Sequence, residues 1–246
     1  IDKNLRLSFP QKNEQELKEI KRKYYQHLTE LAAEMIKMLT MSKKEVAKRY
    51  HCTNPELVNY YFEQGKSVVL MSSHYNNWEW MVLELDAMFQ HHGIGVGAPN
   101  SNKNFEKLIN RARTRYGTEV VFANKIRQVF EKNHAQHHLC SYMLLSDQSP
   151  SNVKKSYITT FLHHPTAVLF GAENFARKYD YPVIYYQVIK IKKGYYQIDC
   201  QLITESPNVI EIGTITKQYL QLLEGTILNQ PEYWLWSHNR WKRKVE

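Results

Sequence analysis

The chain has 246 residues, a formal net charge of +9, and a composition that is 43% hydrophobic and 23% charged. This size and balance are those of a globular protein with a buried core and exclude a disordered or fibrous chain. The basic charge favours an anionic partner, such as an anionic bilayer, nucleic acid, an acidic protein or a phosphorylated substrate. The three cysteines form no CxxC pair, so the sequence indicates neither a disulfide framework nor a structural zinc site.

The N-terminal part of the sequence is helical in pattern. Residues 13–39 carry apolar side chains at the helical period after a capping-box pair, Asn13 and Glu16. Two shorter helices are predicted to begin near Ser42 and at Pro55. We therefore expect a helical cap before the main fold.

From residue 67 onward, short apolar runs alternate with amphipathic segments. The expected buried strands are 67–74, 94–99, 118–123 and 138–146. The expected helices are one that reaches about Gln90, then 104–117, 125–134, 165–180 with Pro165 at its start, and 211–228. Residues 182–205 look like two strands joined at Lys193-Gly194. The alternation predicts a single α/β domain with a mainly parallel central sheet flanked by helices, a helical N-terminal cap and a late β-hairpin.

The stretch "HYNNWE" places a histidine and a carboxylate where a strand gives way to a helix. His74 ends the strand 67–74, at the sheet edge where open α/β sheets bind ligands, and Glu79 falls in the first turn of the next helix. A glutamate facing the imidazole would fix its tautomer, leaving the other nitrogen to act as a general base toward a hydroxyl. The alternative is structural, because Asn76 and Glu79 also form a capping box.

The longer stretch "HYNNWEW" resembles the His-x4-Asp/Glu block of the glycerolipid acyltransferases. More narrowly, it resembles the lauroyl/myristoyl acyltransferases of bacterial lipid A biosynthesis. Further stretches resemble other blocks of that family in the same order, over nearly the whole chain. They are "NLRLSFPQKNEQELKEIKRKYYQHLTELAAEMIK", "NSNKNFEKLINRARTRYGTEVV", "YMLLSDQSP", "HHPTAVLFGAENFARKYDYPVI" and "PEYWLWSHNRWKRK".

The resemblance implies transfer of a fatty acyl chain from a thioester, of acyl carrier protein or of coenzyme A, to a hydroxyl of a lipid A precursor. It implies His74 as the general base and Glu79 as its orienting carboxylate, with no metal and no cofactor. The implied partners are the acyl carrier protein, an anionic glycolipid and a membrane surface, at the cytoplasmic face of the bacterial inner membrane, and no nucleic acid. Residues 1–246 then form the catalytic domain. We expect an N-terminal membrane anchor that is missing from this chain.

Four further residues are candidates for substrate binding. Arg113 and Arg115 correspond to the basic second block of the family, and arginine suits phosphate because its planar fork binds two oxygens. Their alternative role is to be a solvated, charge-rich helix end. Asp147 and Gln148 follow the strand 138–146 at the same sheet edge as His74, where an ordinary turn is the alternative.

The basic and aromatic tail, with Trp236, His238, Arg240 and Trp241, suits either a membrane headgroup layer or packing on the domain. Asn76-Asn77 and "LHHP", residues 162–165, depart from the pattern of the family, which leaves the acceptor and the chain length open. An amino-acid lipid or another glycolipid is an alternative acceptor. A non-enzymatic module that binds membranes or nucleic acid is the alternative to an enzyme.

Overall fold

The structure is a computed structural model and describes residues 1–243. Residues 244–246, the last three of the expected domain, lie outside the described residues, and residue 244 is also the last of the C-terminal block. The strands are β1 (Tyr50–Cys52), β2 (Val68–Ser72), β3 (His92–Gly97), β4 (Glu119–Phe122), β5 (Cys140–Leu145), β6 (Ser156–Phe161), β7 (His164–Leu169), β8 (Val183–Lys192) and β9 (Tyr195–Thr204). The α-helices are α1 (Asp2–Ser8), α2 (Glu14–Met38), α3 (Lys43–Arg49), α4 (Glu56–Glu63), α5 (Trp78–Met88), α6 (Lys103–Arg113), α7 (Ile126–Ala135), α8 (Gly171–Tyr179) and α9 (Thr214–Asn229). Short 3₁₀ turns cover Val153–Lys155 and Pro231–Tyr233.

The central sheet has seven strands in the order β1-β9-β8-β2-β5-β3-β4. Strands β8, β2, β5, β3 and β4 run parallel to one another, and β9 returns antiparallel to β8 as the second strand of the late hairpin. The predicted fold class is therefore confirmed. From β2 to β8, each connection between the parallel strands contains a helix, which is usual for such crossovers.

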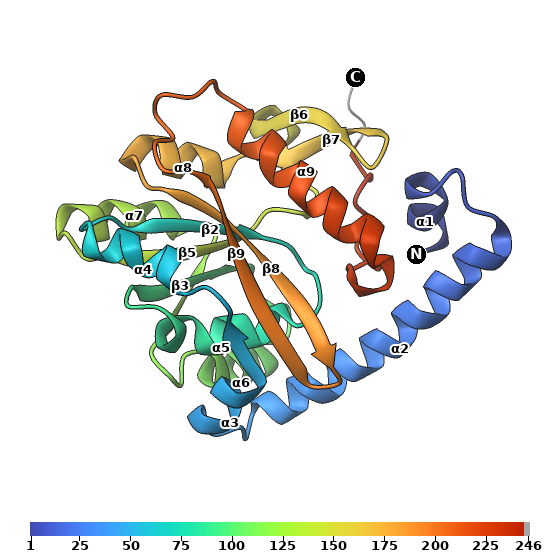
Figure 1. Cartoon of the computed structure of the whole chain (residues 1–246), viewed down its shortest axis with the longest axis horizontal. Helices are drawn as coiled ribbons and strands as arrows, with labels where there is room; N and C mark the ends of the chain where they lie inside the picture. Colours follow the sequence, from blue (N-terminus) through green and yellow to red (C-terminus); the bar gives the residue numbers. More distant parts are fainter. Residues whose placement is uncertain (244–246) are drawn as a thin grey trace.

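Helices cover both faces of the sheet, because successive residues of a buried strand point to opposite sides. In β2, Val69 and Met71 belong to the core beneath α8 and α9, while Val68 and Leu70 belong to the core beneath α3, α5 and α6. Figure 1 shows α8, α9 and the β6–β7 hairpin above the sheet and α3, α5 and α6 below it. The strands in the middle of the sheet therefore have no face in contact with water.

The N-terminal helical cap forms as predicted. The side chain of Asn13 accepts a hydrogen bond from the backbone of Glu16, and the Glu16 side chain reaches back to the Asn13 amide, which completes the capping box of α2. α2 then runs along one side of the molecule, at the lower right in Figure 1. It contributes Tyr24 to one core and Met38 to the other, so it ties the two layers together.

The prediction of a helix over 165–180 is wrong in its first part. Residues His164–Leu169 form β7, which pairs antiparallel with β6, and α8 begins only at Gly171. Pro165 is tolerated there because each strand of a two-stranded hairpin has one unpaired edge. A proline whose missing N–H would point to that edge breaks no hydrogen bond between the strands. The turn consists of Leu162 and His163, both with positive φ. Asn-Gly is the usual pair for such a turn, so the sequence gives no signal for this hairpin.

Candidate active site

The register of two neighbouring strands determines which residues meet at the carboxyl edge of the sheet. β2 and β5 are parallel, with Ser72 paired to Leu145, and Ser146 donates its backbone N–H to the Ser72 carbonyl at 3.0 Å. His74 and Asp147 each lie two residues beyond this last pair. The two side chains are therefore brought side by side from positions 73 residues apart.

His74 and Asp147 form a closely bonded pair. The imidazole Nδ1 lies 2.7 Å from Asp147 Oδ1. The backbone N–H of His74 and the indole N–H of Trp234 both donate to Oδ2, at 3.1 and 2.9 Å. Burial raises the pKa of Asp147, but the positive charge of His74 in its protonated form and the hydrogen bonds from His74 and Trp234 outweigh burial. The pKa of Asp147 therefore lies below its ordinary value.

An anionic Asp147 determines the tautomer of His74. Since a carboxylate can only accept, Nδ1 of the imidazole carries the proton and donates it, which leaves Nε2 with a free lone pair. The side-chain amide nitrogen of Gln148 lies 3.3 Å from this Nε2, in a position to donate to it. The ring of Trp78 packs edge-on against the imidazole at 5.1 Å. The arrangement leaves one basic nitrogen facing outward from the pair.

Glu79, the carboxylate that the sequence analysis assigned to His74, makes a different contact. It receives two hydrogen bonds from the guanidinium of Arg113, at 2.8 and 2.7 Å, and a third from the indole of Trp78 at 3.2 Å. No hydrogen bond joins it to His74 within residues 1–243. Arg113 reaches Glu79 because α5 and α6 lie side by side, and the planar fork matches a carboxylate in two places.

The start of α5 also differs from the predicted capping box. Asn77, and not Asn76, is the N-cap residue, and its side-chain oxygen accepts from the Trp80 amide at 3.0 Å. Asn76 adopts a left-handed φ of 51°, a conformation that glycine and asparagine tolerate best, and its side-chain amide donates to the Val188 carbonyl. Glu79 therefore has no capping role and is free to bind Arg113.

A cavity of about 130 Å³ opens beside His74. Its polar wall carries His74, Glu79 and Arg113. Its other lining residues are mostly apolar and come from α5, β3 to the start of the following loop, β4 and β5: Trp78, Val82, Gly95, Val96, Gly97, Ala98, Val120, Met143 and Leu145. One end is thus equipped for proton transfer and charge binding, and the rest suits an apolar group.

Arg115, the other arginine of the second block, lies away from this cavity. Its guanidinium donates to the backbone carbonyls of Met38, Leu39 and Met41, between 2.7 and 2.9 Å. Met38 is the last residue of α2 and Leu39 its C-cap, so two of the three carbonyls lie where a helix end leaves carbonyls without an intrahelical partner. The structure therefore gives Arg115 a place at the end of α2 and brings only Arg113 to the site.

The C-terminal tail packs on the domain. Trp236 and Arg240 are fully buried. The tail therefore does not present these two residues to a membrane, which differs from the interpretation that placed them in the headgroup layer. Trp234, which the sequence analysis did not single out, reaches Asp147 from this segment. Its indole was the part of the site hardest to foresee, because nothing local relates residues 147 and 234.

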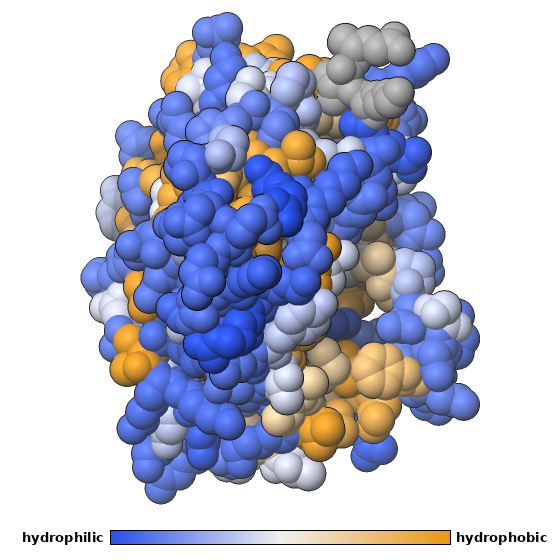
Figure 2. All heavy atoms as spheres, turned by 90° about the vertical axis from the view of Figure 1, so that its right-hand side faces the viewer, coloured by the Kyte–Doolittle hydropathy of each residue, from blue (hydrophilic) through white to orange (hydrophobic). Residues whose placement is uncertain are grey.

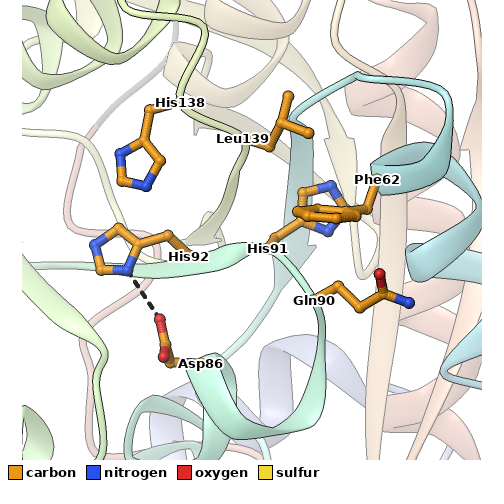
Figure 3. A pocket seen from close by; sticks show the side chains of 7 residues that line it. All are labelled: Phe62, Asp86, Gln90, His91, His92, His138 and Leu139. Carbon is orange, nitrogen blue, oxygen red and sulfur yellow. Dashed lines mark hydrogen bonds and ion pairs between the residues drawn. The ribbon is translucent and has the colours of Figure 1, made fainter.

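A second histidine–aspartate pair lies at the opposite, amino edge of the sheet (Figure 3). His92 Nδ1 is 2.8 Å from Asp86 Oδ1 in a pocket of about 410 Å³. Asp86 also accepts from the Gly93 amide, and a Cβ on Gly117 would come 2.2 Å from the Asp86 carboxylate. These contacts pack the end of α5 against the start of β3. Of these two pairs, the one at His74 has the buried, triply bonded carboxylate, so the smaller cavity at His74 is the candidate active site.

The surrounding histidines are fixed in other ways. His91 is buried and its Nε2 lies 2.9 Å from the Lys66 carbonyl. Over the described part of the chain, no group of three or more His, Cys, Asp or Glu side chains is arranged to hold a metal ion. No helix within residues 1–243 has the length and apolar character needed to cross a bilayer.

Comparison with known proteins connects this geometry to one family. The family model for the bacterial lipid A biosynthesis acyltransferases matches residues 1–243, which include both strands of the His74–Asp147 site and the C-terminal segment with Trp234. No curated protein sequence matches the chain at a significant level.

Proposed function

The chain belongs to the bacterial lipid A biosynthesis acyltransferase family, and from this premise we propose that it is an O-acyltransferase with His74 as its general base. The family transfers an acyl group to a lipid A-like substrate. In our proposal the donor is the thioester of an acyl carrier protein, carrying a lauroyl or myristoyl chain. The acceptor is a hydroxyl of a lipid A precursor.

One observation carries the proposal: the buried, anionic Asp147 holds Nδ1 of His74 and so leaves Nε2 free at the cavity. Orientation of this kind supports general-base catalysis, which contributes about 10²–10⁴ to a rate. Asp147 takes the orienting role that the sequence analysis gave to Glu79. The acceptor hydroxyl displaces the Gln148 amide from Nε2.

The reaction then proceeds by direct transfer. Nε2 takes the hydroxyl proton as the acceptor oxygen bonds to the thioester carbon, and the imidazolium that forms is stabilised by Asp147. When the carbon–sulfur bond breaks, the electron pair leaves with sulfur, and the imidazolium returns the proton to the thiolate. The products are an ester and a free thiol. The thioester is the co-substrate, and the proposed steps use no metal and no cofactor.

Arg113 supplies positive charge beside the reacting groups. Its pairing with Glu79 fixes the guanidinium at the cavity wall. The guanidinium N–H groups that bond to neither Glu79 nor Asn110 remain available for a ligand. We assign them to a phosphate of the acceptor or to the negative charge that develops on the thioester oxygen. Gln148, beside Nε2, contacts the acceptor in the same proposal.

The apolar lining suits an acyl chain, though the size of the cavity limits how much of it fits. A volume of about 130 Å³ is close to that of an apolar cavity of about 150 Å³ that takes a benzene molecule. The cavity therefore holds only a short part of a lauroyl or myristoyl chain. The rest of the chain needs an apolar surface outside it, which we assign to the bilayer or to the carrier complex.

The exposed face of α6 supports a membrane partner. Phe105 and Leu108 are 42% and 48% exposed one turn apart, and Lys103, Lys107 and Arg111 are exposed on the same helix. Apolar and basic groups together favour an anionic lipid surface. The same helix carries Arg113 into the cavity, so a bilayer at α6 would present its lipids close to His74. We place the enzyme at the cytoplasmic face of the inner membrane. The net charge of +9 on the enzyme also favours binding of the acidic carrier protein there.

Figure 2 shows the side of the molecule on which α2 runs. Most of this side is hydrophilic, and apolar side chains gather at the lower right beside a hollow. This side of the molecule therefore offers apolar contact in a restricted region only, which suits peripheral attachment.

Purified protein tests the proposal. Lauroyl-acyl carrier protein is incubated with a lipid A precursor in detergent micelles, and mass spectrometry follows the acylated product. We expect His74→Ala to lower the rate by at least about 10²-fold, because it removes the general base. His92→Ala is the matched control, since it also removes a histidine bonded to an aspartate, at the other sheet edge.

The alternatives appear as other outcomes of this experiment. Transfer to an amino-acid lipid or another glycolipid, with none to the lipid A precursor, would keep the chemistry and overturn the acceptor. A preference for lauroyl-coenzyme A would overturn the donor. A protein that binds lipid vesicles or nucleic acid but transfers no acyl chain would overturn the enzymatic proposal.

A further inference from the structure

We propose that Trp234 is a positioning residue of the active site, whose indole N–H fixes the carboxylate that orients His74. The proposal rests on the proposed function, because it gives Trp234 a part in the same proton transfer. It concerns a residue 87 positions beyond Asp147 in the chain, brought to the site by the C-terminal segment.

The C-terminal segment lies directly along the loop that carries His74. Trp234 forms an antiparallel bridge with Tyr75, and the backbone N–H of Leu235 donates to the His74 carbonyl at 3.1 Å. The Asn76 N–H donates to the Tyr233 carbonyl at 3.0 Å. The same short segment thus holds the backbone of the base and the carboxylate of its partner.

Trp234 completes the set of bonds on Asp147. One carboxylate oxygen faces the imidazole, and the other accepts from the indole at 2.9 Å and from the His74 backbone at 3.1 Å. Without the indole, the second oxygen keeps one donor, and the buried carboxylate can rotate to seek another. Rotation would move the first oxygen away from Nδ1 and release the tautomer that the reaction needs.

The indole itself is held rigidly. Trp234 is buried and packs edge-on against Phe161 and Trp236, with ring centroids 5.9 and 4.7 Å apart. From α1, the side-chain amide of Asn4 donates to the carbonyls of Trp236 and His238 at 3.0 and 2.7 Å. The N-terminal cap thus buttresses the segment that presents the indole, so the donor is in place before substrate binds.

Other charged and titratable groups surround Asp147 without bonding to it. They are His238, Arg240, Tyr185, Tyr186 and Tyr219. Among the described residues, only His74 and Trp234 donate hydrogen bonds to its side chain. Loss of the indole donor therefore leaves no substitute already in position.

The test removes the N–H and leaves the ring. Trp234 is replaced by 3-benzothienylalanine, in which sulfur stands in place of the indole nitrogen, and in parallel by Trp234→Phe. Trp236 receives the same two replacements as the control. Trp236 is equally buried in the same segment, and its indole donates to the Pro231 carbonyl at 2.6 Å, away from Asp147. The isosteric residue keeps the test valid if the phenylalanine variant does not fold.

We expect the sulfur replacement at Trp234 to lower kcat about 10- to 100-fold, the range for loss of one hydrogen bond to a charged group. KM should stay within about twofold, because the indole does not touch substrate. In an Asp147→Asn background the same replacement should cost less than about threefold, since the two act as one unit.

Three results would overturn the inference: an unchanged kcat at Trp234, equal losses at Trp234 and Trp236, or a full additional loss in the Asp147→Asn background. Equal losses would mean that the segment needs only packing. Absence of acyl transfer by the wild-type protein would count against the proposed function itself, which separates the two failures.

Discussion

At the scale of single residues, the site depends on which carboxylate meets the imidazole. Glu79 is five positions from His74 and matches the family pattern, whereas Asp147 is far away in the chain, so the sequence favours Glu79. In the structure, Nδ1 of His74 lies 2.7 Å from Asp147, and Glu79 accepts hydrogen bonds from Arg113. The sequence already placed Asp147 at the right sheet edge. The missing information was that β5 is the neighbour of β2, which is a property of the folded sheet.

Neutral replacements of the two carboxylates should therefore have unequal effects. Asp147→Asn removes the group that fixes the tautomer, and we expect kcat to fall on the order of 10³–10⁴-fold. Glu79→Gln leaves that bond intact and loosens Arg113, so we expect a loss of about 10-fold, mostly in KM. Steady-state kinetics of both purified variants checks this. A larger loss of kcat in Glu79→Gln than in Asp147→Asn would restore Glu79 as the orienting residue.

At the scale of elements, α5 links the site to the rest of the fold. Its N-cap, Asn77, donates to the Glu34 carboxylate of α2 at 2.7 Å, and Tyr196 of β9 donates to the same oxygen at 2.8 Å. Trp80 adds a bond to the Glu34 backbone. Burial raises the pKa of Glu34, although the bonds from Tyr196 and Asn77 oppose this. Three elements therefore fix the loop that carries His74.

One turn further along, α5 carries a carboxyl group that weakens the fold at high pH. Glu84 is buried, its Oε2 has no partner among the described residues, and burial raises its pKa to about 7, against a smaller opposing effect of Lys43. A raised pKa in the folded state means that stability is complete below the ordinary value near 4.5 and is lost as pH rises toward 7.

Glu84→Gln should remove this dependence. At pH 8 we expect the free energy of unfolding to rise by up to about 3 kcal/mol, at about 1.4 kcal/mol per pKa unit, and at pH 4 to change little. Urea unfolding at both pH values measures the difference. Glu63→Gln, an exposed change on α4, controls for the loss of one charge. A gain of the same size at pH 4 and pH 8 would contradict the account of Glu84.

The elements themselves were predictable to different degrees. The buried strands β2, β4 and β5 appear in the sequence as apolar runs bounded by polar residues, and the sequence analysis found each of them. The β6–β7 hairpin was missed because its turn uses Leu162 and His163 at positive φ, and because Pro165 resembles the first residue of a helix. The local preference of Pro165 for the start of a helix predicted the wrong element there, because the pairing of β6 with β7 determines the structure.

At the scale of the whole molecule, the long-range contacts could not be foreseen. The segment that carries Trp234 follows the last helix, α9, yet it reaches across the domain to residues 74–76 and to Asp147. In the tail that looked suited to headgroups, Trp236 and Arg240 are buried, with Arg240 at 2% exposure. Composition could indicate an anionic partner, whereas only the fold shows which aromatic and basic residues remain at the surface.

Attachment to a bilayer is expected to depend on α6. A Phe105→Ser, Leu108→Ser double variant should lower binding to phosphatidylglycerol vesicles by about 10-fold or more, because each side chain loses the gain from leaving water. Vesicle sedimentation at low and high salt measures both the apolar and the charge contributions.

The control for α6 lies on another part of the surface. Val209 and Ile212 are 82% and 62% exposed in the loop before α9, and the same serine changes there should leave vesicle binding unchanged. Loss of binding in the loop variant, with none in the α6 variant, would place the membrane-facing surface at residues 209–212.

The most direct test of the central claim is mass spectrometry of the lipids of source cells that lack this gene, complemented with the wild-type gene or with the His74→Ala or His92→Ala gene. We predict that lipid A lacks one acyl chain in the deletion strain. The wild-type and His92→Ala genes should restore it, and the His74→Ala gene should not. An unchanged lipid A in the deletion strain, or full restoration by His74→Ala, would contradict the account.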